Sequence, residues 1–200
     1  MDSSPKTLTQ YLREIFAGIV TPIAAFLNRI GLTPNMVTLI GLLGQVIAAV
    51  VCAMGYMTWG GIILIIAAPM DFLDGTLARL RGTPTRFGAF FDSVTDRYAE
   101  LAIFGGIFFY YAQRLDWLAC GLVYLAAAGS LMVPYVRARA EGVGFEAKIG
   151  ILSRVERYLV LVPLLVFNQP FWAMAILAVF SNITAIQRIF HVRGQALKEE

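Results

Sequence analysis

The sequence predicts an all-α integral membrane protein with six transmembrane helices, preceded by an amphipathic helix in the membrane interface. Its 200 residues are 58% hydrophobic and only 14% charged, and their mean hydropathy is +0.71. Soluble domains are about 45–50% apolar and about 25% charged, so this composition excludes both a soluble globular protein and a disordered chain. A chain of this length has room for several spans of about 20 residues each.

The N-terminal segment, residues 1–34, is predicted to lie beside the membrane rather than across it. It is not a signal peptide, because residues 1–10 are polar and no compact apolar region with a cleavage site follows them. Apolar residues then recur at steps of three and four, which places them on one helix face: Leu8, Tyr11, Leu12, Ile15, Phe16, Ile19, Val20, Ile23, Phe26, Leu27 and Ile30. This stripe suits a helix in the interface and equally a helix packed on the bundle, and the two can hold together.

Six spans are predicted in the bundle of residues 35–191, at 36–57, 59–80, 88–111, 117–138, 155–168 and 170–190. Of the sixteen Lys and Arg residues, only Arg114 falls in a loop on the outer side, and Trp59, Trp117 and Trp172 open spans at that same side. Positive residues concentrate in cytoplasmic loops and Trp at the interfaces, so both termini, including the tail of residues 192–200, are expected in the cytoplasm. The chain is therefore predicted to be one multi-pass domain in the cell membrane. The net charge of +3 then reflects membrane orientation, and no nucleic-acid partner is expected.

Four aspartates stand at the cytoplasmic ends of the second and third predicted spans. Asp71 and Asp74 are three residues apart, and Asp92 and Asp96 are four apart, so each pair shares one helix face. A short loop joins the two spans, which must run antiparallel, and the four carboxylates therefore converge in one cavity. An ionisable residue within a span costs roughly 2.5–3.5 kcal/mol, which makes a purely structural role a poor explanation for four of them.

The converging carboxylates predict a metal site. Like charges in a pocket of low dielectric repel each other unless they are protonated or neutralised, and two divalent cations neutralise four carboxylates. Ligands that are all oxygen favour Mg²⁺ first, with Mn²⁺ or Ca²⁺ next. A cation channel or transporter also uses intramembrane carboxylates, but it would place them near mid-membrane or along a pore. Their position at the cytoplasmic ends favours an enzyme instead.

The same region carries a motif that resembles the signature of the CDP-alcohol phosphotransferase family. It reads D-x-x-D-G-x-x-A-R-x8-G-x-x-x-D-x-x-x-D and is filled by Asp71, Asp74, Gly75, Ala78, Arg79, Gly88, Asp92 and Asp96. Residues 31–38, before the first span, are similar to the nucleotide-contacting start of that family. The resemblance covers most of the chain and includes the layout of six spans.

The resemblance implies a role for each of these positions. Asp71, Asp74 and Asp92 would hold two metal ions that bridge the diphosphate of a CDP-linked lipid. Asp96 would take the proton from the acceptor hydroxyl and also contact a metal ion. Contacts to the CDP-lipid are expected from Asn35, Met36, Val37, Thr38, Gly75, Ala78, Arg79 and Thr85.

The second cytoplasmic loop suggests the other substrate. Tyr135, Arg137, Arg139 and Glu141, followed by Glu156-Arg157 and Gln187-Arg188, are similar to the phosphatidylinositol-phosphate synthase branch of the family. In that branch basic residues hold the phosphate of inositol 1-phosphate, which would here be the task of Arg137, Arg157 and Arg188. Each of these arginines can instead serve as a positive-inside anchor.

The leading hypothesis is transfer of the phosphatidyl group of CDP-diacylglycerol to inositol 1-phosphate, which gives phosphatidylinositol phosphate and CMP. Within the family, the alternative is glycerol 3-phosphate as the acceptor, with phosphatidylglycerol phosphate as the product. From other classes, the alternatives are a cation channel or transporter and a structural scaffold, but a scaffold explains neither Asp71 nor Asp92. The resemblance further implies a homodimer with its active site facing the cytoplasm.

Overall fold

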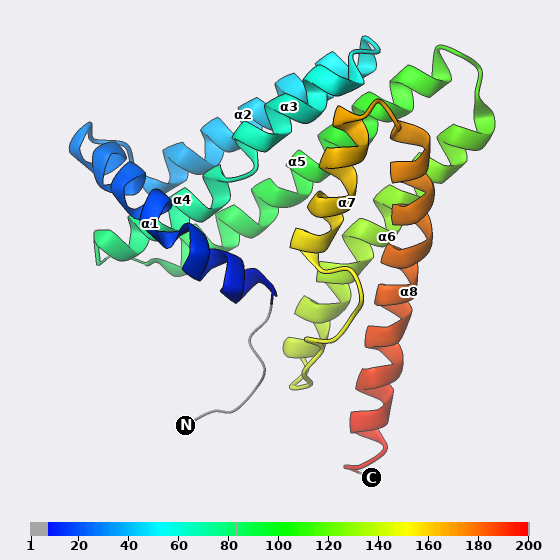
Figure 1. The fold of residues 1–200 in the computed structure, drawn as a ribbon. Coiled ribbons are helices and arrows are strands. Elements are labelled where there is room, and N and C mark those ends of the chain that lie inside the picture. The colour runs from blue at the N-terminus through cyan, green and yellow to red at the C-terminus, as the bar shows by residue number, and fades with distance from the viewer. Residues whose placement is uncertain (1–7, 83, 200) are drawn as a thin grey trace.

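The computed structural model describes residues 8–82 and 84–199, and within the first helix it places side chains at residue 18 and from residue 20 onward. These residues form eight helices (Figure 1): α1 (Leu8–Arg29), α2 (Pro34–Ala53), α3 (Met57–Ala67), α4 (Met70–Leu80), α5 (Arg86–Ala112), α6 (Trp117–Glu141), α7 (Arg154–Val166) and α8 (Pro170–Ala196). The predicted all-helical class is confirmed over the described part of the chain.

Helix α1 packs on α4 at one end of the bundle (Figure 1). Ala24 is fully buried there in a small core with Val37, Leu73 and Leu77, whereas the side chain of Phe26 is 60% exposed. The first half of the predicted apolar stripe, from Leu8 to Ile19, lies outside the described side chains. Within the described half of the stripe, Val20 and Leu27 pack against this core, whereas Ile23, Phe26 and Ile30 are exposed.

Helix α2 begins at a sequence-encoded cap. Thr33 is extended and its hydroxyl oxygen accepts a hydrogen bond from the Met36 amide at 3.3 Å, while Pro34 occupies the first helical turn, where its missing amide hydrogen costs nothing. Helix α5 begins in the same way, because the Thr85 hydroxyl oxygen accepts a bond from the Gly88 amide at 2.9 Å. These caps set the ends of the two helices that border the aspartates.

The segment predicted as one span at 59–80 forms two helices, with a break at Ala68 and Pro69. Proline has no amide hydrogen and its ring clashes with the preceding turn, so an α-helix does not continue through it undisturbed. The break places Asp71 in the first turn of α4, immediately beside the α2–α5 contact.

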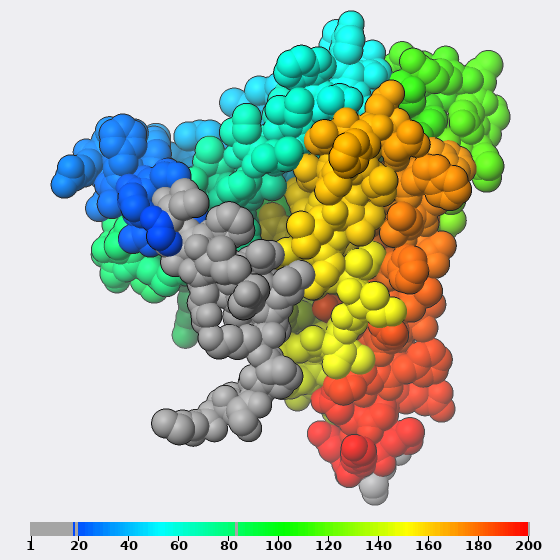
Figure 2. All heavy atoms as spheres, viewed as in Figure 1, coloured from blue at the N-terminus to red at the C-terminus, as the bar shows by residue number. Residues whose placement is uncertain are grey.

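Helices α2 and α5 pack against each other with very little space between their backbones. A Cβ atom added at Gly106 would lie 2.1 Å from the carbonyl oxygen of Ala49, so only glycine permits this approach. Helices α6 and α8 also pack against each other along an extensive contact. The short helix α7 lies between α3 and α8 (Figures 1 and 2).

Among the described residues, four segments are long and apolar enough to cross a membrane, namely Pro34–Ala53, Met57–Leu80, Trp117–Glu141 and Pro170–Ala196. Of the other two predicted spans, α5 carries several charged residues and α7 has only 13 residues. Helix α8 also continues to Ala196, so it extends beyond the predicted span end at 190 and into the predicted tail. Large apolar side chains face outward, such as Ile66 (65% exposed) and Phe109 (62%), as expected for contact with lipid.

Candidate active site

Three of the four predicted aspartates converge where α4 meets α5. One carboxylate oxygen from each of Asp71, Asp74 and Asp92 lies within 4.8 Å of the others. Oδ1 of Asp92 is buried and has no hydrogen-bond partner among the described residues. A buried, unpartnered carboxylate oxygen is costly, and an all-oxygen cluster of this kind fits a hard divalent cation.

Asp74 is held in place by α2. The Thr38 hydroxyl donates to Oδ2 of Asp74 at 2.5 Å, and both side chains are buried. The sequence analysis placed Thr38 among the CDP-lipid contacts. Its observed contact is with an aspartate of the cluster, and partners of this kind orient a metal ligand and tune its affinity.

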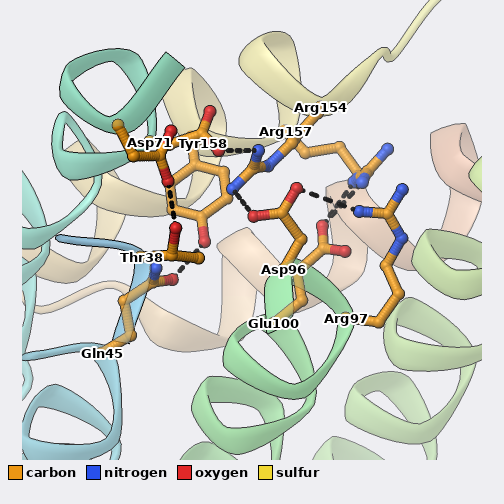
Figure 3. Close-up of polar contacts among 10 residues, drawn as sticks. Thr38, Gln45, Asp71, Asp96, Arg97, Glu100, Arg154, Arg157 and Tyr158 are labelled. Atoms are coloured by element: carbon orange, nitrogen blue, oxygen red, sulfur yellow. Dashed lines mark hydrogen bonds and ion pairs between the residues drawn. The ribbon is translucent and has the colours of Figure 1, made fainter. Parts of the chain in front are cut away.

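Asp96 lies outside the group of three and is bound by two arginines. Its Oδ1 pairs with Nη2 of Arg154 at 2.5 Å, and its Oδ2 pairs with Nη1 of Arg97 at 3.2 Å (Figure 3). Nη1 of Arg154 also pairs with Oδ1 of Asp71 at 2.9 Å, so this one guanidinium links α4 to α5. A carboxylate with both oxygens engaged has a defined orientation.

Arg154 is a site residue that the sequence analysis missed. Its position at the start of the fifth predicted span suggested only a cytoplasmic loop. The available signal was its spacing of three from Arg157, which puts the two guanidinium groups on one face of α7.

A small pocket adjoins the carboxylates and is built by α2, α4 and α5, with the last residue of α3 and the first residue of α7. Asp71, Asp74, Asp96 and Arg154 form its polar side. Apart from Leu42, the remaining lining residues are small or polar: Thr38, Gly41, Gln45, Ala67, Thr95 and Ala99. Three carboxylates against one guanidinium give this wall a net negative charge, which suits a divalent cation.

The three arginines predicted to bind the acceptor lie near one another. Arg188 of α8 is within electrostatic range of both Arg137 of α6 and Arg157 of α7. Arg157 and Arg188 are buried, at 3% and 5% exposure, while Arg137 is exposed. Three neighbouring guanidinium groups form a cationic cluster, and such a cluster suits a phosphate.

Each of these arginines is also held by the protein. Nε of Arg137 pairs with Oε1 of Glu141 at 2.9 Å. Arg188 donates from Nε to the carbonyl oxygen of Ile149 at 2.8 Å and from Nη1 to that of Val133 at 2.6 Å. Arg157 donates to Glu100 from Nε and Nη2. Among the described residues, Nη1 of Arg157 and Nη2 of Arg188 have no protein partner, so both remain able to donate to a bound anion.

The predicted CDP-lipid contacts lie around the N-termini of α2 and α5. Oδ1 of Asn35 is 3.8 Å from the place where a Cβ would stand on Gly88, and the oxygen of Thr85 is 3.0 Å from the same point. On α4, Nη1 of Arg79 lies 3.6 Å from the corresponding point on Gly75, and Nη2 of Arg79 donates to Thr76 at 2.9 Å. Glycine at these two positions leaves room for a ligand beside the helix backbone.

The other residues predicted to contact the CDP-lipid differ in how far their side chains are buried. Met36 is 47% exposed and Ala78 is partly buried, so both can meet a ligand. The side chain of Val37 is only 1% exposed and packs with Leu73 and Leu77, so this side chain is directed into the core and only the backbone of Val37 is left for the predicted contact. An apolar side chain at this turn of α2 is used to hold α4 in place.

The chain is similar to known proteins over most of its length. Residues 31–188 match the family of CDP-alcohol phosphatidyltransferases. The phosphatidylinositol phosphate synthase of Mycobacteroides abscessus is 38% identical over 192 residues, which cover 90% of this chain and 86% of that protein. The synthase of the same name from Mycobacterium marinum is 39% identical over 191 residues, covering 90% of this chain and 82% of that protein.

Solved structures are also similar. The phosphatidylinositol phosphate synthase of Mycobacterium tuberculosis with CDP-DAG bound superposes with a TM-score of 0.82 at 33% identity, over 87% of this chain and 93% of that one. Its complex with manganese and citrate gives a TM-score of 0.82 at 33% identity, over 86% and 88% of the two chains. The chain therefore belongs to the CDP-alcohol phosphatidyltransferase family and is a membrane enzyme of that class.

Proposed function

We propose that this enzyme transfers the phosphatidyl group of CDP-diacylglycerol to inositol 1-phosphate, releasing CMP and phosphatidylinositol phosphate. The observation that carries the proposal is the adjacency of two charged clusters at the start of α7. Arg154 contacts the aspartates at Asp71 and Asp96, while Arg157, three residues later, belongs to the arginine cluster. A diphosphate and a phosphorylated acceptor can thus bind side by side.

The aspartates would hold two Mg²⁺ ions, with Mn²⁺ as a substitute. Asp71, Asp74 and Asp92 are the proposed ligands, with Asp96 able to contribute an oxygen. The all-oxygen donor set, the unpartnered Oδ1 of Asp92 and a solved relative that contains manganese support this assignment. When bound, the ions would neutralise charge on the diphosphate and on the departing CMP.

Asp96 is the proposed general base. The acceptor hydroxyl attacks the phosphorus that carries the diacylglycerol, its proton passes to Asp96, and the bond from that phosphorus to the CMP oxygen breaks. Arg154 and Arg97 hold the two Asp96 oxygens, which aims the carboxylate at the acceptor. Asn35, Gly75, Arg79 and Thr85 would hold the CDP group on the opposite side of the phosphorus.

The proposed arrangement in the membrane has six spans and both termini in the cytoplasm. Two of these spans are α5, which carries several charged residues, and α7, which is short. The N-terminal ends of α3, α6 and α8 lie together at the upper end of the bundle in Figure 1, and each begins near an exposed tryptophan, as expected at an interface. Outward-facing Phe26 and Ile30 suit an interfacial position for α1. We further propose a single domain of residues 1–200 that acts as a homodimer, on the basis of the family resemblance.

The proposal is tested by an acceptor screen with purified protein, CDP-diacylglycerol and Mg²⁺, in which the release of CMP is followed. Inositol 1-phosphate is expected to give the fastest release, ahead of glycerol 3-phosphate, free inositol and serine. Faster release with glycerol 3-phosphate would replace the proposed acceptor. If no acceptor released CMP while the protein carried a cation flux across liposomes, the transferase assignment itself would be wrong.

Replacing Arg137 with Ala tests the phosphate pocket. Loss of one charge-assisted hydrogen bond costs on the order of 1.5–3 kcal/mol, so the KM for the phosphorylated acceptor should rise roughly tenfold to a hundredfold. The KM for CDP-diacylglycerol should barely change. Arg157→Ala is a less direct test than the sequence suggested, because it would leave Glu100 buried and unpaired.

Arg139→Ala is the matched control for Arg137→Ala, since it removes an exposed arginine two residues along the same helix. Both variants weaken positive-inside anchoring equally, and only Arg137→Ala should alter the acceptor KM. Equal loss of membrane insertion in the two variants, with both KM values unchanged, would identify Arg137 as an anchor and remove it from the pocket.

A further inference from the structure

Glu100 is a buried carboxylate on α5 to which no role has been assigned. It is 4% exposed, and its Oε1 accepts hydrogen bonds from Nε of Arg157 at 2.9 Å and from Nη2 of Arg157 at 2.7 Å (Figure 3). Arg157 is equally buried. A buried charge is tolerated only with a partner, so these two residues fix each other's position.

This pair is one of two ion-pair layers between α5 and α7. Asp96 and Glu100 are four residues apart on α5, and Arg154 and Arg157 are three apart on α7, so each couple shares a helix face. Asp96 pairs with Arg154 in the first layer, and Glu100 pairs with Arg157 in the second. The proposed base and an arginine of the acceptor pocket are therefore tied together through one turn of each helix.

The next residue of α7 reinforces this attachment. The hydroxyl of Tyr158 donates to Oε1 of Gln45 on α2 (Figure 3). The start of α7 is thus bonded to α2, α4 and α5, and Arg157 has little freedom to move. A planar guanidinium held in this way along its Nε–Nη2 edge presents its remaining nitrogen, Nη1, in a set direction.

The charges around Arg157 also require a carboxylate. Arg137 and Arg157 both lie within electrostatic range of Arg188, so three positive groups would repel one another in a partly buried pocket. Glu100 offsets the charge of Arg157 from the side opposite to its free nitrogen. The pocket keeps an excess of positive charge for a phosphate without driving Arg157 away from it.

We propose that Glu100 is a positioning residue that holds Arg157 for the phosphate of the acceptor and thereby sets the distance from that phosphate to Asp96. The ligand class is a phosphorylated polyol, and the inference rests on the proposed function. Glu100 touches neither substrate and acts through Arg157. Its removal should affect the acceptor and leave the CDP-lipid unaffected.

The test measures both KM values in Glu100→Gln, which keeps the shape and a carbonyl oxygen but removes the charge. With inositol 1-phosphate as the probe, the acceptor KM should rise by about tenfold or more, since charge-assisted bonds to the guanidinium are lost. The KM for CDP-diacylglycerol should stay within about twofold, because Arg79 and the aspartates do not contact Glu100. Glu156→Gln, which removes a carboxylate from the first turn of α7, is the matched control and should change neither value.

A double-mutant cycle with Arg157→Gln shows whether Glu100 acts through Arg157. The double variant Glu100→Gln/Arg157→Gln contains a neutral pair and no unpaired buried charge, so it avoids the folding penalty of Glu100→Gln alone. Its acceptor KM should equal that of Arg157→Gln, because the first substitution has nothing further to disturb. Independent, multiplied effects of the two substitutions would overturn the inference.

The remaining outcomes separate the inference from the proposed function. If Arg157→Gln left the acceptor KM unchanged, the proposed phosphate pocket would be wrong. If Arg157→Gln raised that KM and Glu100→Gln did not, only the role of Glu100 would be overturned. A lower melting temperature in Glu100→Gln with both KM values unchanged would assign Glu100 to folding alone and also overturn the inference.

Discussion

Asp92→Asn is expected to reduce CMP release to below about a tenth of the wild-type rate, because an amide oxygen cannot replace the charge of a carboxylate that binds a divalent cation. Oδ1 of Asp92 is buried and lacks a partner among the described residues, so the wild-type protein offers a full ligand at this point. Asp71→Asn should have a comparable effect. It also weakens the pairing of Arg154, which makes Asp92→Asn the more direct experiment. The measurement is the initial rate with saturating CDP-diacylglycerol, acceptor and Mg²⁺.

Asp116→Asn is the matched control for these variants. Asp116 caps α6 by accepting a hydrogen bond from the Ala119 amide at 3.0 Å, and asparagine caps helices equally well. The same chemical change at the opposite end of the bundle should leave the rate unaltered. Activity in Asp92→Asn above about a tenth of wild type would contradict the two-metal assignment.

Asp96→Asn is expected to lower kcat by roughly 10²–10⁴-fold, the usual contribution of a positioned general base. Binding of CDP-diacylglycerol should fall far less, because Asp71, Asp74 and Asp92 remain as the converging cluster. Arg154 also retains its ion pair with Asp71, so the local structure has a second support. The two quantities are separated by measuring kcat and, without acceptor, the equilibrium binding of CDP-diacylglycerol.

A loss of CDP-diacylglycerol binding in proportion to the loss of kcat would make Asp96 mainly a metal ligand. In that case another group would have to take the acceptor proton. The position of Asp96 outside the group of three favours the base.

Local features of the site could be predicted from the sequence alone. The spacings of Asp71 to Asp74 and of Asp92 to Asp96 are helical, and a short loop forces their two helices to run antiparallel. The caps at Thr33 and Thr85 likewise depend on residues only three positions away. Interactions between residues so close in the sequence depend little on how the rest of the chain packs.

The predicted second span is confirmed as a segment that can cross a membrane, but it is built of two helices rather than one. The segment from residue 59 to residue 80 is apolar enough to be predicted as one helix, and it is long enough to cross a membrane. Pro69 nevertheless ends α3, and this break allows α4 to present Asp71 and Asp74 toward α5. A proline signals such a break, but how the second helix turns after it depends on packing.

The sequence by itself determined an apolar, helical chain, the two aspartate pairs and the family motif, because each depends on composition or on residues within one or two turns. Only the tertiary structure decided that Arg154 joins Asp71 to Asp96, that Glu100 holds Arg157 across a separation of 57 residues, and that Val37 faces the core. In a membrane protein both the lipid-facing and the buried faces of a helix are apolar, so hydrophobic periodicity does not reveal which faces meet. The partners of a buried charge are set by that packing.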